Sequence, residues 1–420
     1  MRPCRTRGFD RTRGSPTGGV PTSSSSGTWW AWAIGSSSSR LGLRRPDSSR
    51  DRVLTEIPVA SDSAASVTSR SLRIRRSLGP TSARTSSVVM DILQNRQRRL
   101  SIPRPPSDRV GMTETYEVIV IGGGAAGLSA ALVLGRARRR TLVVDAGEPR
   151  NAPAAHMQGY LSRDGMSPAG FLAAGRAEIA RYGVELVRDR AVGVERNEEF
   201  TLTLASGRTV RARRLVVATG LKDELPDVPG VAERFGKDVL HCPYCHGWEV
   251  RDRSFGVLAA SPASVHQALM VSQWSKDVTF FLHEVAESDL SDDDLRRLAA
   301  AGVTVVPGEV AEVLTEEDRI TGVRLADGTR HAREVLFVAP RAVPRTGLLE
   351  QLGAEFQQTP QGAYPVVDPT GLTSVPGVWA AGNAMGFSEQ VVNAAAGGYR
   401  AGATINGELL MADLDAASSA

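Results

Sequence analysis

The chain has 420 residues, of which 41% are hydrophobic and 5% aromatic, so it is long enough for two or three domains of an α/β protein. No apolar run approaches the roughly 18 residues that a membrane-spanning helix needs, and this excludes a protein that spans a membrane. Residues 1–111 carry 20 arginines and 7 acidic residues, whereas the rest of the chain carries 30 basic and 39 acidic residues; the acidic body excludes a nucleic-acid partner despite the overall pI of 9.2.

The first 111 residues are rich in serine and arginine and show no sustained helical or strand period. Such a tract cannot bury enough apolar surface to offset the entropy of ordering, so we expect it to be disordered. We expect translation to start at Met112, just before the first strand; a targeting peptide or a disordered tail are the alternatives. Residues 1–111 are therefore left out of the fold argument.

A β-α-β unit follows directly. Residues 116–121 form a short apolar run typical of a buried parallel strand, an Ala/Leu-rich helix runs to about Leu134, and residues 141–144 form the next strand. Asp145 stands at the end of this second strand. The turn between the first strand and the helix reads G-x-G-x-x-G, and the whole unit in this order predicts a dinucleotide site.

Each glycine of this motif has a physical role. The first allows the tight turn, the second lets the backbone approach a pyrophosphate, and the third lets the helix pack on the strand. Free N–H groups at the helix N-terminus favour the phosphates, and the carboxylate of Asp145 can accept hydrogen bonds from ribose hydroxyls. The expected contacts of the diphosphate are Gly122, Gly124, Ala125, Ala126 and Gly127.

The rest of the body repeats this pattern. We expect helices over 168–182, 263–274 and 390–410, and strands over 215–219, 255–259, 278–282, 335–339 and 378–380. Two dinucleotide-type units, the first completed by the C-terminal segment, predict an α/β fold with two Rossmann-like three-layer domains. The expected discontinuous first domain spans 112–228 and 340–415, and the inserted domain spans 229–339.

Two of only three cysteines stand in a C-x-x-C pair, Cys242 and Cys245, followed by His246. Such a pair can form and break a disulfide, and a neighbouring histidine can carry protons near neutral pH. A zinc site that includes His241 and a pair of inert buried cysteines are the alternatives. Few cysteines in a long body fit a reducing cytoplasm with one catalytic dithiol.

Residues 115–412 resemble the low-molecular-weight thioredoxin reductases, within the pyridine nucleotide–disulfide oxidoreductases. Besides the first glycine motif, the resemblance rests on the Ala218-Thr219-Gly220 turn, on the C-x-x-C at the start of the inserted domain, and on the run 376–382. It implies FAD, a protein or small-molecule dithiol or disulfide as substrate, and a homodimer. It also places Thr219, Gly220, Gly382, Asn383 and Gln390 at the cofactor.

Within this resemblance, Cys245 faces the flavin and Cys242 exchanges with the substrate sulfur. His246 stands where the family usually has aspartate, and Asn383 also replaces a usual aspartate. The helix that begins near Gln390 points its positive end at the flavin pyrimidine.

The inserted domain departs from the family at its own turn. Residues 259–264 contain no glycine, although Ser261 can act as an N-cap and Pro262 suits a first helical turn. Glu284 stands where NADPH-using members carry arginines, and it suits the ribose of NADH instead. The sequence leaves open NADPH, NADH or neither. Three functions therefore stay open: a reductase, a dithiol oxidase that uses O2, and a non-catalytic flavin-bound redox sensor.

Overall fold

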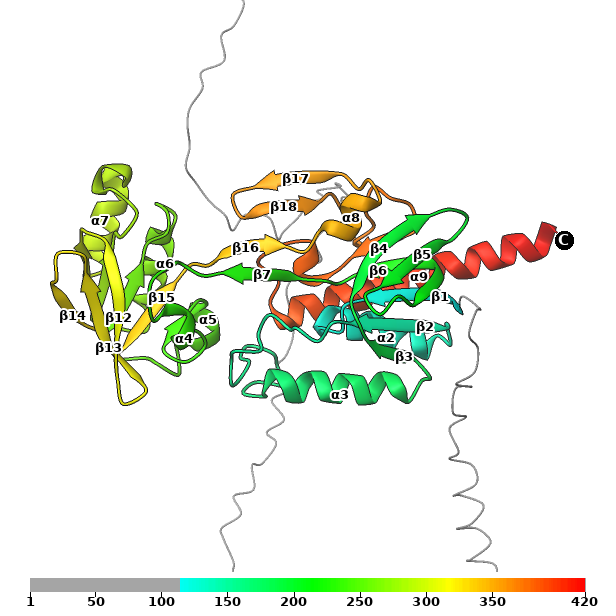
Figure 1. The fold of residues 1–420 in the computed structure, drawn as a ribbon, viewed down its shortest axis with the longest axis horizontal. Coiled ribbons are helices and arrows are strands. Elements are labelled where there is room, and N and C mark those ends of the chain that lie inside the picture. The colour runs from blue at the N-terminus through cyan, green and yellow to red at the C-terminus, as the bar shows by residue number, and fades with distance from the viewer. Residues whose placement is uncertain (1–113, 420) are drawn as a thin grey trace, which may run out of the picture. The chain divides into compact units, whose positions relative to one another are not determined.

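Two parallel β-sheets organise the part of the chain that the computed structural model describes, residues 114–419 (Figure 1). The expectations for residues 1–111 lie outside this range. None of the described helices is both long and apolar enough to cross a membrane.

The first sheet has the strand order β3-β2-β1-β6-β5-β4, with β19 paired to β6. Strands β1, β2, β3, β6 and β19 are parallel, and β4 and β5 complete the sheet as an antiparallel extension. Its strands are β1 (Glu114–Ile121), β2 (Thr141–Asp145), β3 (Glu185–Arg188), β4 (Ala191–Arg196), β5 (Phe200–Leu204), β6 (Thr209–Val217) and β19 (Val378–Ala380).

Alternate residues of β1 serve two separate cores, because successive side chains of a strand point to opposite faces. Val118 and Val120 pack against α2 (Ala125–Arg136), α3 (Pro168–Ala180) and α9 (Val391–Ser419). Ile119 and Ile121 pack on the other face, where α8 (Gly347–Gln351) also lies. The arrangement confirms the predicted α/β layers.

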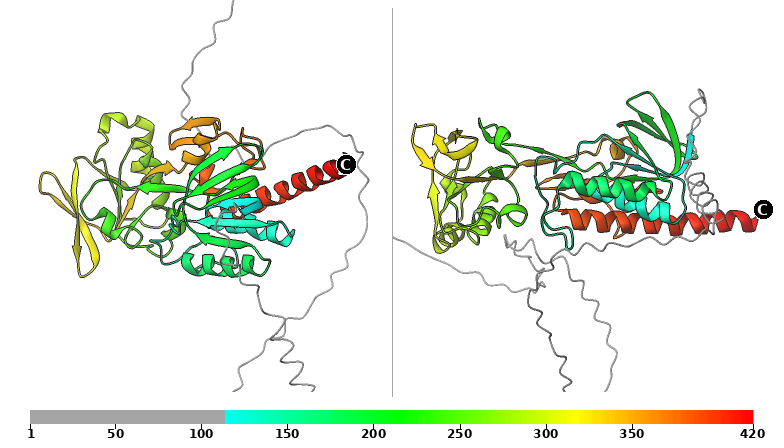
Figure 2. Two further views of the ribbon diagram at one scale, coloured as in Figure 1. Left: turned by 45° about the vertical axis from the view of Figure 1, so that its right-hand side comes forward. Right: turned by 90° about the horizontal axis from the view of Figure 1, so that it is seen from below.

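Helix α9 packs beside α2 at very close range, as Figure 2 also shows. A Cβ added at Gly398 would lie 1.9 Å from the backbone oxygen of Ala126, and one at Gly402 would lie 2.8 Å from that of Ala130. Only glycine permits such backbone proximity. The contact therefore fixes how closely α9 lies against α2.

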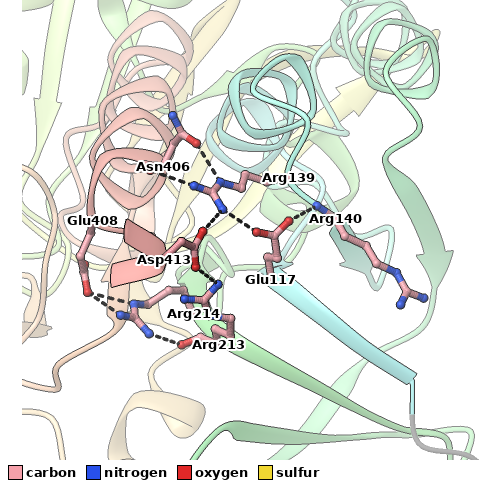
Figure 3. A network of polar contacts seen from close by, with 8 residues as sticks. All are labelled: Glu117, Arg139, Arg140, Arg213, Arg214, Asn406, Glu408 and Asp413. Atoms are coloured by element: carbon pink, nitrogen blue, oxygen red, sulfur yellow. Dashed lines mark hydrogen bonds and ion pairs between the residues drawn. The ribbon is translucent and has the colours of Figure 1, made fainter. Parts of the chain in front are cut away.

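The far half of α9 is held by Arg139, whose side chain is mostly buried (Figure 3). Its guanidinium donates to Glu117 of β1 at 2.6 Å, to Asp413 at 2.8 Å and to the Asn406 side chain at 2.9 Å. Two further ion pairs join β6 to α9, Arg213–Asp413 and Arg214–Glu408, both at 2.7 Å. A shared network of this kind is worth more than isolated surface pairs.

The second sheet is wholly parallel, with the order β11-β10-β9-β15-β8. Its apolar strands are buried on both faces, by helices on one side and by an antiparallel three-stranded sheet on the other. The strands are β8 (Val239–Leu240), β9 (Phe255–Leu258), β10 (Val278–Phe281), β11 (Val303–Val306) and β15 (Val335–Val338); the covering elements are α6 (Ser264–Val271), α7 (Asp292–Ala300), β12 (Val310–Glu316), β13 (Arg319–Leu325) and β14 (Arg330–Ala332).

One antiparallel pair, β7 (Leu221–Glu224) with β16 (Arg341–Pro344), lies where the chain passes between the two sheets. These strands stand near the expected limits of the inserted segment, and the domain boundaries themselves stay a prediction. The remaining described elements are α4 (Val231–Arg234), α5 (Pro243–His246), η1 (Glu287–Asp289), β17 (Phe356–Thr359), β18 (Gly362–Pro365) and η2 (Gly382–Ala384).

The expected limits of three helices were wrong. Helix α3 ends at Ala180 rather than at residue 182. Helix α9 runs to Ser419 rather than to about Leu410, and Arg139 pairs with Asp413 within this added stretch. Helix α6 begins at Ser264, and Ser261 is not its N-cap. The carbonyl of Ser261 instead closes a turn by accepting from the N–H of Ser264, which delays the start of the helix.

The close contact of α9 and α2 yields a stability prediction. Replacing Gly398 with alanine should lower the free energy of unfolding by about 1–3 kcal/mol, because its Cβ would overlap backbone that cannot give way. Gly407→Ala on the same helix is the matched control, since a Cβ there meets nothing within 4 Å. It should raise stability by up to about 1 kcal/mol. Urea unfolding measures both, and equal effects would contradict the packing argument.

Candidate active site

The first glycine turn has the geometry of a phosphate cradle. Gly122 has φ +109°, and a Cβ there would lie 2.2 Å from the Ala218 backbone oxygen. A Cβ at Gly127 would lie 1.8 Å from the Gly122 oxygen, whereas one at Gly124 would meet nothing within 4 Å. Contacts within the protein thus require glycine at positions 122 and 127. At Gly124, by contrast, a side chain would meet no other atom of the protein.

The backbone N–H groups at this turn fit a dinucleotide. Among the described residues, none accepts a hydrogen bond from the N–H groups of Gly124, Ala125 or Ala126 at the start of α2. Unpartnered N–H groups at a helix N-terminus form an anion site. The residues present therefore fit the diphosphate of FAD.

Asp145 helps to shape this turn. Its Oδ1 accepts hydrogen bonds from the N–H groups of Gly123 and Gly147, each at 3.1 Å. A Cβ at Gly123 would lie 2.6 Å from the Asp145 carboxyl carbon. Sequence reasoning missed Gly123, although a third consecutive glycine was the available signal. The expected contact of Asp145 with a ribose stays a prediction.

The C-terminal segment reaches the same turn. Gly382 has φ +65°, and a Cβ there would lie 2.9 Å from the Ala126 Cβ. The Asn383 amide donates to the carbonyls of Gly386 and Phe387, each at 3.0 Å, and so shapes the loop before α9. The Thr219 hydroxyl donates to the Arg345 carbonyl at 2.9 Å. These two side chains hold backbone, and their expected cofactor contacts, with that of Gly220, stay predictions.

Cys242 and Cys245 form a disulfide, with their Cα atoms 5.2 Å apart. Cys242 precedes the short helix α5 and Cys245 lies within it, so one helical turn sets their spacing. Tyr244 between them is exposed, as is Trp248 just beyond α5. Sulfurs bonded to each other leave no thiolate for zinc.

Gln390 brings the start of α9 to this disulfide. Its Nε2 lies 3.7 Å from Cys242 Sγ, and its Oε1 lies 3.5 Å from Cys245 Sγ. The disulfide thus lies beside the N-terminal end of the helix that packs on α2. Neither cysteine is near Gln390 in sequence, and no local pattern predicts this contact.

The two histidines around the disulfide lie in low-polarity surroundings. Burial lowers the pKa of His241, whose Nδ1 lies 3.2 Å from the Val338 carbonyl oxygen. Burial also lowers the pKa of His246, against the opposing effect of the Cys242 carbonyl. The buried Nδ1 of His246 has no hydrogen-bond partner of standard geometry among the described residues.

Arg150 was missed by sequence reasoning. It forms a two-pronged ion pair with Asp223 of β7, with both N–O distances at 2.8 Å, and a third contact with the Phe387 carbonyl at 3.4 Å. It thereby ties the loop after β2 to β7 and to the segment before α9. A lone arginine in a loop gives no sequence signal for this role.

The second dinucleotide-type turn differs from the first. The Ser264 hydroxyl accepts the Ala260 N–H at 3.1 Å, and the N–H groups of residues 264–266 donate to the carbonyls of residues 261–263. Beyond β10, His283 is buried and accepts the Val310 N–H at 3.1 Å. Glu284 is exposed beside it. This turn therefore offers fewer N–H groups than the first, because Pro262 has none and the Ala260 N–H is engaged.

Comparison with known proteins gives concordant results. The family model described as pyridine nucleotide-disulphide oxidoreductase matches residues 116–398. Thioredoxin reductase sirT of Leptosphaeria maculans is 33% identical over 320 residues, which cover 72% of this chain and 97% of that protein. The crystal structure of HlmI is 50% identical and covers 74% of this chain and 98% of that chain, with a TM-score of 0.70. An oxidoreductase from Agrobacterium tumefaciens is 39% identical over 71% of this chain and 99% of its own, with a TM-score of 0.67.

The lowered pKa of His241 predicts that stability depends on pH. Below about pH 6.5 the unfolded chain binds more protons than the folded one, so the free energy of unfolding should fall as the pH drops. One such group contributes at most about 1.4 kcal/mol per pH unit. Replacing His241 with asparagine should flatten this dependence.

Urea unfolding between pH 5 and 8 measures the slope. The matched control is the same substitution at the exposed His266. An unchanged slope in His241→Asn would show that this imidazole is not held neutral by the fold.

Proposed function

Because the chain belongs to the pyridine nucleotide-disulphide oxidoreductase family and is a FAD-dependent enzyme acting on a sulfur group, we propose that it works through the Cys242–Cys245 disulfide. The pair exchanges two electrons with FAD and two with a dithiol or disulfide substrate. One observation carries the proposal: Gln390 touches both sulfurs at the start of α9. The same helix packs on α2, whose first turn fits the FAD diphosphate.

The first dinucleotide turn would hold FAD. The N–H groups of Gly124, Ala125 and Ala126 would bind its diphosphate, and the carboxylate of Asp145 would reach its ribose. Gly382 and Gln390 would line its other end. When bound, FAD supplies the two-electron chemistry that the disulfide itself cannot start.

The dithiol would carry the exchange with the substrate. A substrate thiolate attacks one sulfur of the disulfide, the Cys242–Cys245 bond breaks, and a mixed disulfide forms; the second substrate thiol then releases the oxidised substrate. The reverse sequence reduces a substrate disulfide. Exposed Tyr244 and Trp248 flank the pair and offer flat apolar faces to an approaching substrate.

His246 would move the proton of this exchange. Burial lowers its pKa, so the imidazole is neutral near pH 7 and can accept a proton. Its Nδ1 is buried without a partner of standard geometry among the described residues, and the Cys242 carbonyl favours the protonated imidazole. His241 is engaged with the Val338 carbonyl instead.

A second candidate function rests on the second turn. Members of the family use NADPH or NADH, but here the turn that would bind a nicotinamide dinucleotide contains no glycine, Pro262 has no N–H, and the Ala260 N–H is engaged by Ser264. This favours a dithiol oxidase, in which the substrate dithiol supplies both electrons and O2 takes them as peroxide. The homodimer and the cytoplasmic location stay proposals.

Loss of either cysteine tests the first proposal. Cys242→Ser and Cys245→Ser should each lower turnover of a dithiol or disulfide substrate by about a thousandfold or more, because neither a disulfide nor a mixed disulfide relay can then complete. FAD content should stay unchanged. Thr304→Ser, at an exposed site on β11 away from the pair, is the control. Turnover that survives in Cys245→Ser would refute the role of this disulfide.

Anaerobic mixing with candidate electron donors distinguishes a reductase from a dithiol oxidase. We expect dithiothreitol to bleach the flavin absorbance of the purified protein, and NADPH and NADH to do so much more slowly, because the second turn lacks glycine and its Ala260 N–H is engaged by Ser264. Peroxide should appear when O2 is readmitted. Rapid bleaching by either nicotinamide would establish the reductase direction and remove the oxidase candidate.

A further inference from the structure

The Gln390 amide meets the two sulfurs with opposite ends. Its donor Nε2 faces Cys242 Sγ at 3.7 Å, and its acceptor Oε1 faces Cys245 Sγ at 3.5 Å. In the disulfide neither sulfur carries a hydrogen, so only the contact with Nε2 is a hydrogen bond. After reduction the two contacts would become chemically different. A thiolate can only accept, and a thiol can donate.

We propose that Gln390 directs the reduced pair into one protonation form, with the thiolate on Cys242 and the proton on Cys245. The inference rests on the proposed function, since it concerns the reduced state of the same disulfide. In this form Nε2 donates to the Cys242 thiolate, and the Cys245 thiol donates to Oε1. The opposite form would place the lone pairs of Oε1 against a thiolate and leave Nε2 without a charged acceptor.

The reduction step balances with a single proton. Two electrons from a two-electron donor, reduced FAD or a phosphine, break the Sγ–Sγ bond. The bonding pair and the donated pair leave one electron pair on each sulfur: the pair on Cys245 takes up one proton, and the pair on Cys242 remains as the thiolate. The amide itself is neither oxidised nor protonated. The amide determines which of the two sulfurs, Cys242 or Cys245, carries the single proton.

Other charges around the pair do not make this choice. On the same segment, His241 and His246 are held neutral, because burial lowers the pKa of both. Arg150, from the loop after β2, is paired on both prongs with Asp223 of β7. Glu389, before α9, has a pKa raised by burial. The amide and the positive end of α9 are therefore the polar groups that face the sulfurs.

This assignment makes Gln390 a catalytic residue of the proposed exchange. Only a thiolate attacks a disulfide, so the preferred nucleophile is Cys242. Cys245 stays protonated until the mixed disulfide on Cys242 is resolved. The amide thereby prevents both sulfurs from competing for the same substrate.

Site-resolved alkylation tests the proposal. The holoenzyme is reduced anaerobically with tris(2-carboxyethyl)phosphine and treated with iodoacetamide between pH 4 and 10, and the alkylation of each cysteine is quantified by peptide mass spectrometry. In the native protein Cys242 should react about tenfold faster than Cys245 near pH 7, with its half-point at least about one pH unit lower.

Three variants sharpen the result. Gln390→Leu should slow Cys242 about tenfold near pH 7, and Gln390→Glu should slow it further, because a carboxylate repels the thiolate while keeping the side-chain length. Gln358→Leu, at an exposed site on β17, is the matched control and should leave both rates unchanged. Circular dichroism confirms that each variant is folded.

The outcomes separate this inference from the proposed function. Faster alkylation of Cys245, or a Cys242 profile that is unchanged in Gln390→Leu, would overturn the role of the amide while leaving the dithiol function intact. Retained turnover in the cysteine-to-serine variants would instead refute the function itself. A selective shift of Cys242 alone would support the inference, since general loss of structure would expose both cysteines equally.

Discussion

The backbone contact between α9 and α2 is the constraint on which the rest of the site depends. Gly398 and Gly402 bring α9 so close to α2 that a single added Cβ would strike backbone oxygen. Apolar packing and the Arg139 network then hold the two ends of this contact. Because both helices are rigid, their N-terminal ends are positioned together. The phosphate cradle lies at one of these ends and the disulfide at the other.

The two dinucleotide-type units share a topology but differ in their hydrogen bonds. In the first, three consecutive N–H groups at the start of α2 have no acceptor among the described residues, and Asp145 holds the turn open from behind. In the second, the corresponding stretch contains Pro262, which has no N–H, and the Ser264 hydroxyl accepts the N–H of Ala260. Since a phosphate binds by accepting such N–H groups, the same β-α-β shape offers different chemistry in the two places.

The disulfide lies among neutral polar groups rather than charges. Burial keeps His241 and His246 neutral, and Arg150 is paired with Asp223. The Gln390 amide contacts both sulfurs directly, with its donor end toward Cys242 and its acceptor end toward Cys245. A single amide at the start of α9 can therefore decide between two sulfurs. This links the helix packing directly to the proposed exchange chemistry.

The sequence by itself determined the features that depend on neighbouring residues. The strand–glycine–helix order, the spacing of Cys242 and Cys245, and the lack of glycine in the second turn are all local, and they predicted the α/β fold and the family. Only the tertiary structure decided which distant groups meet. Gln390 lies 145 residues from Cys245 in sequence, and Arg139 lies 274 residues from Asp413. The true start of α6 also escaped sequence reasoning, because a turn closed by backbone carbonyls outweighed the capping preference of Ser261. Such contacts arise from packing, where the whole chain selects the partners of each polar group.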